Sequence, residues 1–140
     1  MIRILWIMWL AVLTHLLWGV LLLNNGEVVT GITAIHHTME LGFSVTGLGL
    51  SYLVIAGLAA LGLRTEMKGY FAIVCVLPQQ FFLVYSAIGA VQAIWHSSFA
   101  DGVMRPRAFI AADQAPVIFL AILHTCAFTE GYIRRLSQSF

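Results

Sequence analysis

Residues 41–63, LGFSVTGLGLSYLVIAGLAALGL, decide the fold, because they hold no charged side chain between Glu40 and Arg64. A helix needs about 20 apolar residues to cross the hydrocarbon core of a bilayer, and this run has that length. Charged side chains are costly in hydrocarbon, so they mark where such runs begin and end. The chain holds three more runs of similar length, which cover residues 4–23, 70–95 and 108–129. The sequence therefore predicts four transmembrane helices.

The composition excludes several classes of protein. Of 140 residues, 61% are hydrophobic and 9% are charged, whereas soluble domains are about half apolar and a quarter charged. So few charges cannot cover a water-soluble globule, and they argue equally against a disordered chain and against nucleic-acid binding. The net charge of +1 predicts no polyanionic partner. We expect an all-α integral membrane protein, a four-transmembrane-helix bundle that forms a single domain over residues 1–140 and binds bilayer lipid.

Basic residues predict the orientation, because cytoplasmic loops carry an excess of lysine and arginine. Five of the 7 basic residues fall on the side that holds both termini and the loop at 64–69. The other two, Arg105 and Arg107, fall on the opposite side. We therefore expect a multi-pass protein with both termini in the cytoplasm, and with residues 24–40 and 96–107 facing outward.

Residues 28–39 add one further element. Val28, Ile32, Ile35 and Met39 recur at the spacing of one face of a helix. A segment of this kind, placed between two spans, predicts a short amphipathic helix that lies in the outer interface of the membrane.

A cluster of histidine and glutamate is predicted at the same interface. His36 and His37 lie four and three residues before Glu40, so each shares a helix face with the carboxylate. His96, at the end of the third span, reaches the same level. Imidazole nitrogens and carboxylate oxygens are ligands that transition metals accept in proteins. These four residues are the candidate metal site. The alternatives to a metal site are that these side chains face water and lipid headgroups, or that they sense pH.

The histidine positions do not favour haem. With a rise of ~1.5 Å per residue, His15 lies near the midplane, and His124 lies roughly 9 Å closer to the inner boundary, at the level of Cys75. Two histidines that ligate one haem need matching depths on facing helices, so this difference argues against the pair. The chain also has no CxxCH motif for covalent attachment of haem.

Two layers of polar side chains are predicted inside the membrane. One, near the midplane, contains His15 of the first span and lies at the level of Tyr52 in the second. The other, in the outer leaflet, contains Asp113. An ionisable residue inside a span is a functional hypothesis by default, and a hydrogen-bonded lock between helices is the structural alternative. The candidate proton relay comprises Asp113, His15, Tyr85, Gln79 and Gln80.

No G-x-S-x-G, HExxH, Walker A or GxGxxG motif occurs in the chain, and almost all of it is predicted to be span. The sequence therefore favours a non-enzymatic structural or accessory subunit that packs against partner membrane proteins or copies of itself. One alternative is a subunit that binds a transition metal or a redox cofactor through the outer histidine and glutamate cluster. The second is a small proton-coupled transporter or channel that uses Asp113 and His15.

Overall fold

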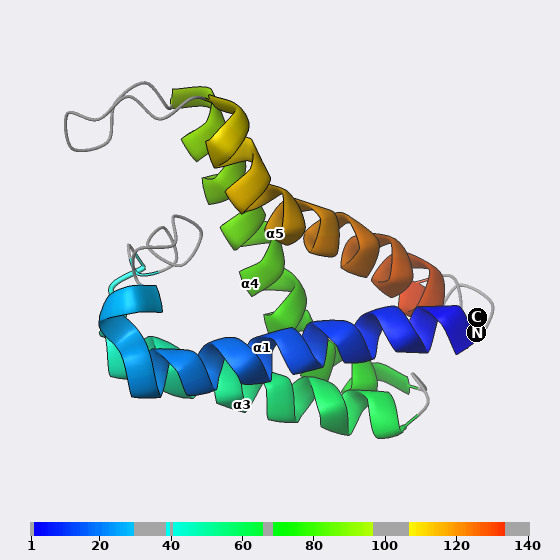
Figure 1. Cartoon of the computed structure of the whole chain (residues 1–140). Helices are drawn as coiled ribbons and strands as arrows, with labels where there is room; N and C mark the ends of the chain where they lie inside the picture. Colours follow the sequence, from blue (N-terminus) through cyan, green and yellow to red (C-terminus); the bar gives the residue numbers. More distant parts are fainter. Residues whose placement is uncertain (1, 30–38, 40, 66–68, 97–106, 134–140) are drawn as a thin grey trace.

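The structure, a computed structural model, describes residues 2–29, 39, 41–65, 69–96 and 107–133, and within these ranges it is helical without strands. The prediction of an all-α chain is confirmed for this part of the sequence. The elements in chain order are α1 (Ile2–Val29), α3 (Val45–Arg64), α4 (Gly69–His96), α5 (Arg107–Phe128) and a π-helical turn, η1 (Thr129–Ile133) (Figure 1).

Three of these helices are long and apolar enough to cross a membrane. They contain the stretches Ile4–Gly26, Val45–Arg64 and Tyr70–Gln92, which correspond to the first three predicted spans. The fourth predicted span, 108–129, falls on α5, but the apolar stretch described there is the shorter Ala115–Gly131. The structure therefore supports a helical membrane protein with three helices of spanning length and a fourth helix whose described apolar stretch is shorter.

The boundary of the first span is a break in the helix. Asn25 has the non-helical backbone angles φ −136° and ψ 45°, and helical structure then continues to Val29. The predicted interfacial helix at 28–39 lies largely outside the described residues. Met39, at its end, packs against the buried cluster of Leu22, Leu48 and Tyr52.

A turn and a cap precede α3, where the sequence predicted the start of the second span. Gly42 has a φ of +91°, a conformation that glycine adopts without steric cost, and its N–H donates to the Met39 carbonyl at 2.9 Å. Ser44 is the N-cap, and its hydroxyl accepts the N–H of Gly47 at 3.0 Å. The helix therefore begins at Val45, later than the apolar run.

We expect Ser44→Ala to lower the free energy of unfolding by about 1 kcal/mol, because the N–H of Gly47 loses its acceptor. Denaturation in mixed detergent micelles measures this change. Thr46→Ala is the matched control, since Thr46 is an exposed hydroxyl residue in the same first turn. Equal losses in the two variants would contradict a capping role for Ser44.

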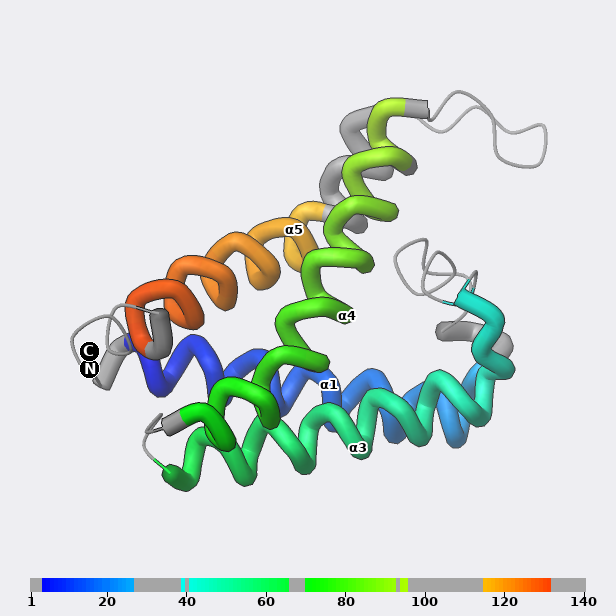
Figure 2. Tube along the Cα trace, turned by 180° about the vertical axis from the view of Figure 1, so that it is seen from behind, coloured from blue at the N-terminus to red at the C-terminus, as the bar shows by residue number. Residues whose placement is uncertain are grey.

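Helices α1 and α3 form a closely packed antiparallel pair (Figures 1 and 2). A Cβ atom built on Gly19 would lie 3.0 Å from the carbonyl oxygen of Gly49, so the two backbones approach each other where both residues lack side chains. Lipid supplies no hydrophobic drive between helices, and small residues instead allow the close contact that stabilises them. The α1/α3 pair is thus the base on which α4 and α5 pack.

Helices α4 and α5 cross this pair. The first half of α4 packs along α3, and its second half points away from α1 and α3 together with the beginning of α5 (Figures 1 and 2). The end of α5 returns to the start of α1, where Ala127 and Phe128 share a buried cluster with Met8 and Val12. The helices therefore meet at oblique angles, and all four converge near the middle of α1.

Candidate functional site

Buried polar side chains meet where the four helices converge. His15, Gln79 and His124 are at most 2% exposed, although burying a polar group is costly unless it is hydrogen-bonded. Together with Gln80 and Thr125 they form one connected set, which we call the polar cluster. Helix α1 supplies one member, α4 supplies two and α5 supplies two.

The pattern of burial along α1 explains why His15 faces inward. In the described part of this helix the buried residues are Met8, Ala11, Val12, His15, Gly19 and Leu22. Their spacing of three, four and seven residues defines one face of an α-helix. His15 therefore occupies a core position, and hydrogen bonds rather than solvent must satisfy its ring.

His124 lies between the side chains of two consecutive glutamines. Its Nδ1 is 2.5 Å from Oε1 of Gln80, and its Nε2 is 3.2 Å from Oε1 of Gln79. The amide of Gln80 also donates to the Thr125 hydroxyl at 2.6 Å, and that hydroxyl donates to the Ala121 carbonyl at 2.7 Å. These contacts join α4 to α5 through polar atoms.

His15 is joined to α4 and α3 in a different way. Its Nδ1 lies 3.0 Å from the carbonyl oxygen of Ala11 and 3.4 Å from Nε2 of Gln79. The Tyr52 ring packs edge-on against the imidazole, with the two ring centroids 5.1 Å apart. The Nε2 atom is buried and has no hydrogen-bond partner among the described residues. His15 is therefore the member of the cluster with an open polar atom.

Part of the predicted midplane layer is brought together. His15, Gln79 and Tyr52, placed at one level by counting along the spans, are in mutual proximity around His15. Gln80 belongs to the same cluster, although it reaches it through His124. The sequence correctly indicated that these residues share a level, but not which of them make contact.

The predicted depth of His124 is wrong. The sequence placed it in an inner layer with Cys75, yet it contacts the two glutamines of the midplane layer, and Cys75 lies beside Gly62. The reason is that α5 runs obliquely (Figure 1), so a fixed rise counted from its end does not give its depth. The predicted difference in depth is therefore no longer an argument against His15 and His124 as a pair. The Gln79 side chain nevertheless lies between the two imidazoles and contacts both.

Two residues of the predicted relay, Tyr85 and Asp113, belong to the predicted outer-leaflet layer. Tyr85 is partly exposed, and its ring stacks on Phe81 of the same helix with centroids 5.9 Å apart. Asp113 lies in α5, but its side chain is outside the described part of the structure. A role for Asp113 in proton transfer stays a prediction.

The predicted metal site also stays a prediction. His36, His37 and Glu40 lie outside the described residues, and of His96 only the backbone at the end of α4 is described. Within the described ranges, no group of three or more His, Cys, Asp and Glu side chains is placed to hold a metal ion. A metal or redox function therefore gains no support from this part of the chain.

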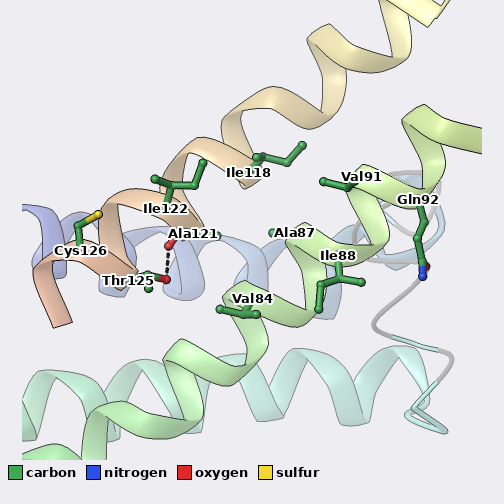
Figure 3. Close-up of a pocket in the computed structure, with 10 residues that line it drawn as sticks. All are labelled: Val84, Ala87, Ile88, Val91, Gln92, Ile118, Ala121, Ile122, Thr125 and Cys126. Carbon is green, nitrogen blue, oxygen red and sulfur yellow. Dashed lines mark hydrogen bonds between the residues drawn. The ribbon is translucent and has the colours of Figure 1, made fainter. Parts of the chain in front are cut away.

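An apolar groove of about 510 Å³ separates α4 from α5 beside the polar cluster. Figure 3 shows side chains from Val84 to Val91 on one wall and from Ile118 to Cys126 on the other. The hydroxyl of Thr125 reaches the groove, but its hydrogen bonds to Gln80 and Ala121 already occupy it. Sequence reasoning missed this groove, and small residues such as Ala87 and Ala121 were the only signal for it.

Comparison of the chain with protein-family models, with curated proteins and with solved structures found no match in any of the three.

Proposed function

We propose that the chain is a multi-pass integral membrane protein and a non-enzymatic accessory subunit that packs against another transmembrane helix, supplied by a second copy or by a larger membrane complex. In this proposal α5 is the fourth transmembrane helix, both termini are cytoplasmic, and residues 28–39 form an interfacial helix. The exposed face of α1 supports membrane embedding, because Trp6, Leu13 and Leu17 are 58 to 71% exposed. Soluble proteins rarely expose large contiguous apolar surfaces.

The groove between α4 and α5 is the observation that carries the proposal. Association of helices in lipid depends on close van der Waals packing, because the lipid tails are as apolar as the side chains. The groove has two small residues, Ala87 and Ala121, between larger ones such as Ile88 and Ile122. Side chains of a neighbouring helix would fill such a surface better than they would fill the outer face of α1, where large side chains such as Leu13 and Leu17 are exposed.

A photo-crosslinking amino acid at position 122 tests the proposal. Ile122 lines the groove and is 55% exposed, whereas Phe119, on the same helix, is 63% exposed and does not line it. We expect protein–protein adducts at position 122 at least several times more often than at position 119. An adduct of twice the chain mass in the purified, reconstituted protein identifies a second copy. A stoichiometric co-purifying chain in the adduct identifies a partner subunit.

Two outcomes would contradict the proposal. Adducts with lipid alone at position 122, in both native membranes and the reconstituted protein, would show that no helix occupies the groove. Equal protein adducts at positions 119 and 122 would show that chains collide without using this surface.

A further inference from the structure

The open Nε2 atom of His15 is the starting observation. The side chain is 2% exposed, and this nitrogen has no partner within the described residues. Buried polar atoms are nearly always hydrogen-bonded, so an exception calls for an explanation such as a bound ligand or a catalytic role. Helix α3 places the Tyr52 ring edge-on against the imidazole.

The contact of Nδ1 with the Ala11 carbonyl assigns the proton on His15. A carbonyl oxygen only accepts hydrogen bonds, so the 3.0 Å contact with Ala11 requires a proton on Nδ1. A neutral ring protonated at Nδ1 carries a lone pair at Nε2. The open atom of His15 is therefore an acceptor, and its lone pair is available to bind a proton.

His124 has the opposite environment. Both of its ring nitrogens face amide oxygens, Gln80 Oε1 at 2.5 Å and Gln79 Oε1 at 3.2 Å. An imidazole can donate from both nitrogens only as the imidazolium cation. In this orientation of the amides, the pocket around His124 is complementary to a protonated ring.

The amide of Gln79 connects the two histidines. In the orientation described, its amino group faces Nδ1 of His15 at 3.4 Å, which suits a ring without a proton on Nδ1. If the amide turns over, its oxygen faces Nδ1 of His15 and its amino group faces Nε2 of His124, which suits an Nδ1-protonated His15 and a neutral His124. The two amide orientations therefore correspond to two protonation states of one site. Oxygen and nitrogen of an amide are assigned from such hydrogen-bond patterns.

We propose that His15 and His124 form an intramembrane proton-binding pair that holds one exchangeable proton, with the Gln79 amide between them. The proton comes from hydronium, which leaves as water, and it binds a ring-nitrogen lone pair. The pair takes one proton rather than two, because two cations this close in a medium of low dielectric constant repel strongly. His124 takes up the charge when the Gln79 oxygen faces it, and Nε2 of His15 is the alternative acceptor.

Among the residues that the structure describes, those packed against the pair do not supply a competing charge. Tyr52 is the titratable side chain that α3 places against His15, and α4 contributes the neutral amides of Gln79 and Gln80. On α5, Thr125 continues the hydrogen-bonded chain to the groove. This site differs from the relay that the sequence suggested, because its second ionisable member is His124 rather than Asp113.

Nitrogen NMR on protein labelled with ¹⁵N in its histidine rings, reconstituted in bilayers, tests the proposal. The spectra of His15→Leu and His124→Leu assign the two residues. We expect both rings to be neutral at high pH, with His15 protonated at Nδ1. On acidification of the folded protein, one proton should bind to the pair, so that one ring moves to the imidazolium position while the other stays neutral.

Two further variants separate a coupled pair from two isolated histidines. Gln79→Leu should abolish the coupling, so that each ring titrates without reference to the other. Gln92→Leu is the matched control, because this exposed glutamine lies on the same helix outside the cluster, and its spectra should equal those of the parent. The proposal is wrong if neither ring takes up a proton before the helices separate, or if the parent protein titrates as Gln79→Leu does.

Discussion

His124→Leu is expected to lower the free energy of unfolding by about 2 kcal/mol, because the imidazole is the shared partner of two glutamine amides. A buried donor or acceptor left without its partner costs about 1 to 3 kcal/mol. Hydrogen bonds between transmembrane helices contribute less on average, about 0.6 kcal/mol, because the separated helices find other partners. The value here should be larger, since Gln79 is completely buried and leucine offers it no replacement.

The matched variant is His15→Leu, which removes an equally buried imidazole from the same cluster. His15 has one nitrogen that is already unpaired, so its removal also removes an unsatisfied atom. We expect a change in unfolding free energy within about 1 kcal/mol of zero, because replacing a poorly satisfied polar group by an apolar one is close to neutral. Denaturation of both variants in mixed micelles measures the difference. Equal losses of unfolding free energy in His15→Leu and His124→Leu would show that the open nitrogen of His15 carries no energetic cost.

The long apolar helices were readable from the sequence because the cost of burying a charge acts on each residue separately. The first three predicted spans fall on helices that are long and apolar enough to cross a membrane, and hydropathy found them without any knowledge of neighbours. The beginning of α3 was missed because Gly42 and Ser44 lie inside an apolar run, where an averaged property conceals a turn and a cap. Local backbone geometry, rather than polarity, decides where that helix begins.

The polar cluster was only half predictable for a related reason. Counting along α1 and α4 brought His15 and Gln79 to one level, because those two residues lie near the middle of their helices. The same count failed for His124, since it assumed that α5 stands upright. Crossing angles depend on which side chains fit together, and a sequence of mostly apolar residues does not reveal this. The faces that meet neighbouring helices and those that meet lipid have nearly the same composition.

Gly62 and Gly57 show how that ambiguity is resolved by the structure. The two glycines lie on α3, five positions apart, and the sequence gives no reason to rank them. A Cβ atom at Gly57 would meet nothing within 4 Å, whereas at Gly62 it would lie 2.9 Å from the carbonyl oxygen of Ala72 and 3.0 Å from Cβ of Cys75. Only Gly62 therefore lies where α3 and α4 touch.

Gly62→Val is expected to lower the free energy of unfolding by about 3 kcal/mol, at the upper end of the range for overpacking a core. The obstructing Ala72 atom belongs to the backbone of α4 and cannot rotate away, so α4 must move as a whole. Gly57→Val is the matched control and should be neutral or stabilising by roughly a few tenths of a kcal/mol, because valine has the higher helix propensity. Denaturation in mixed micelles measures both.

The same pair of variants tests whether the polar cluster depends on the contact between α3 and α4. Gly62 contacts the first two turns of α4, and Gln79 lies farther along that helix. If valine displaces the start of α4, Gln79 shifts relative to His15, and the ring-nitrogen spectrum of His15 should change in Gly62→Val but not in Gly57→Val. An unchanged His15 spectrum in a destabilised Gly62→Val protein would show that α4 bends locally, for which Pro78, just before Gln79, provides the flexible point. The result therefore decides whether α4 transmits packing at its first turns to the buried histidines as a rigid rod.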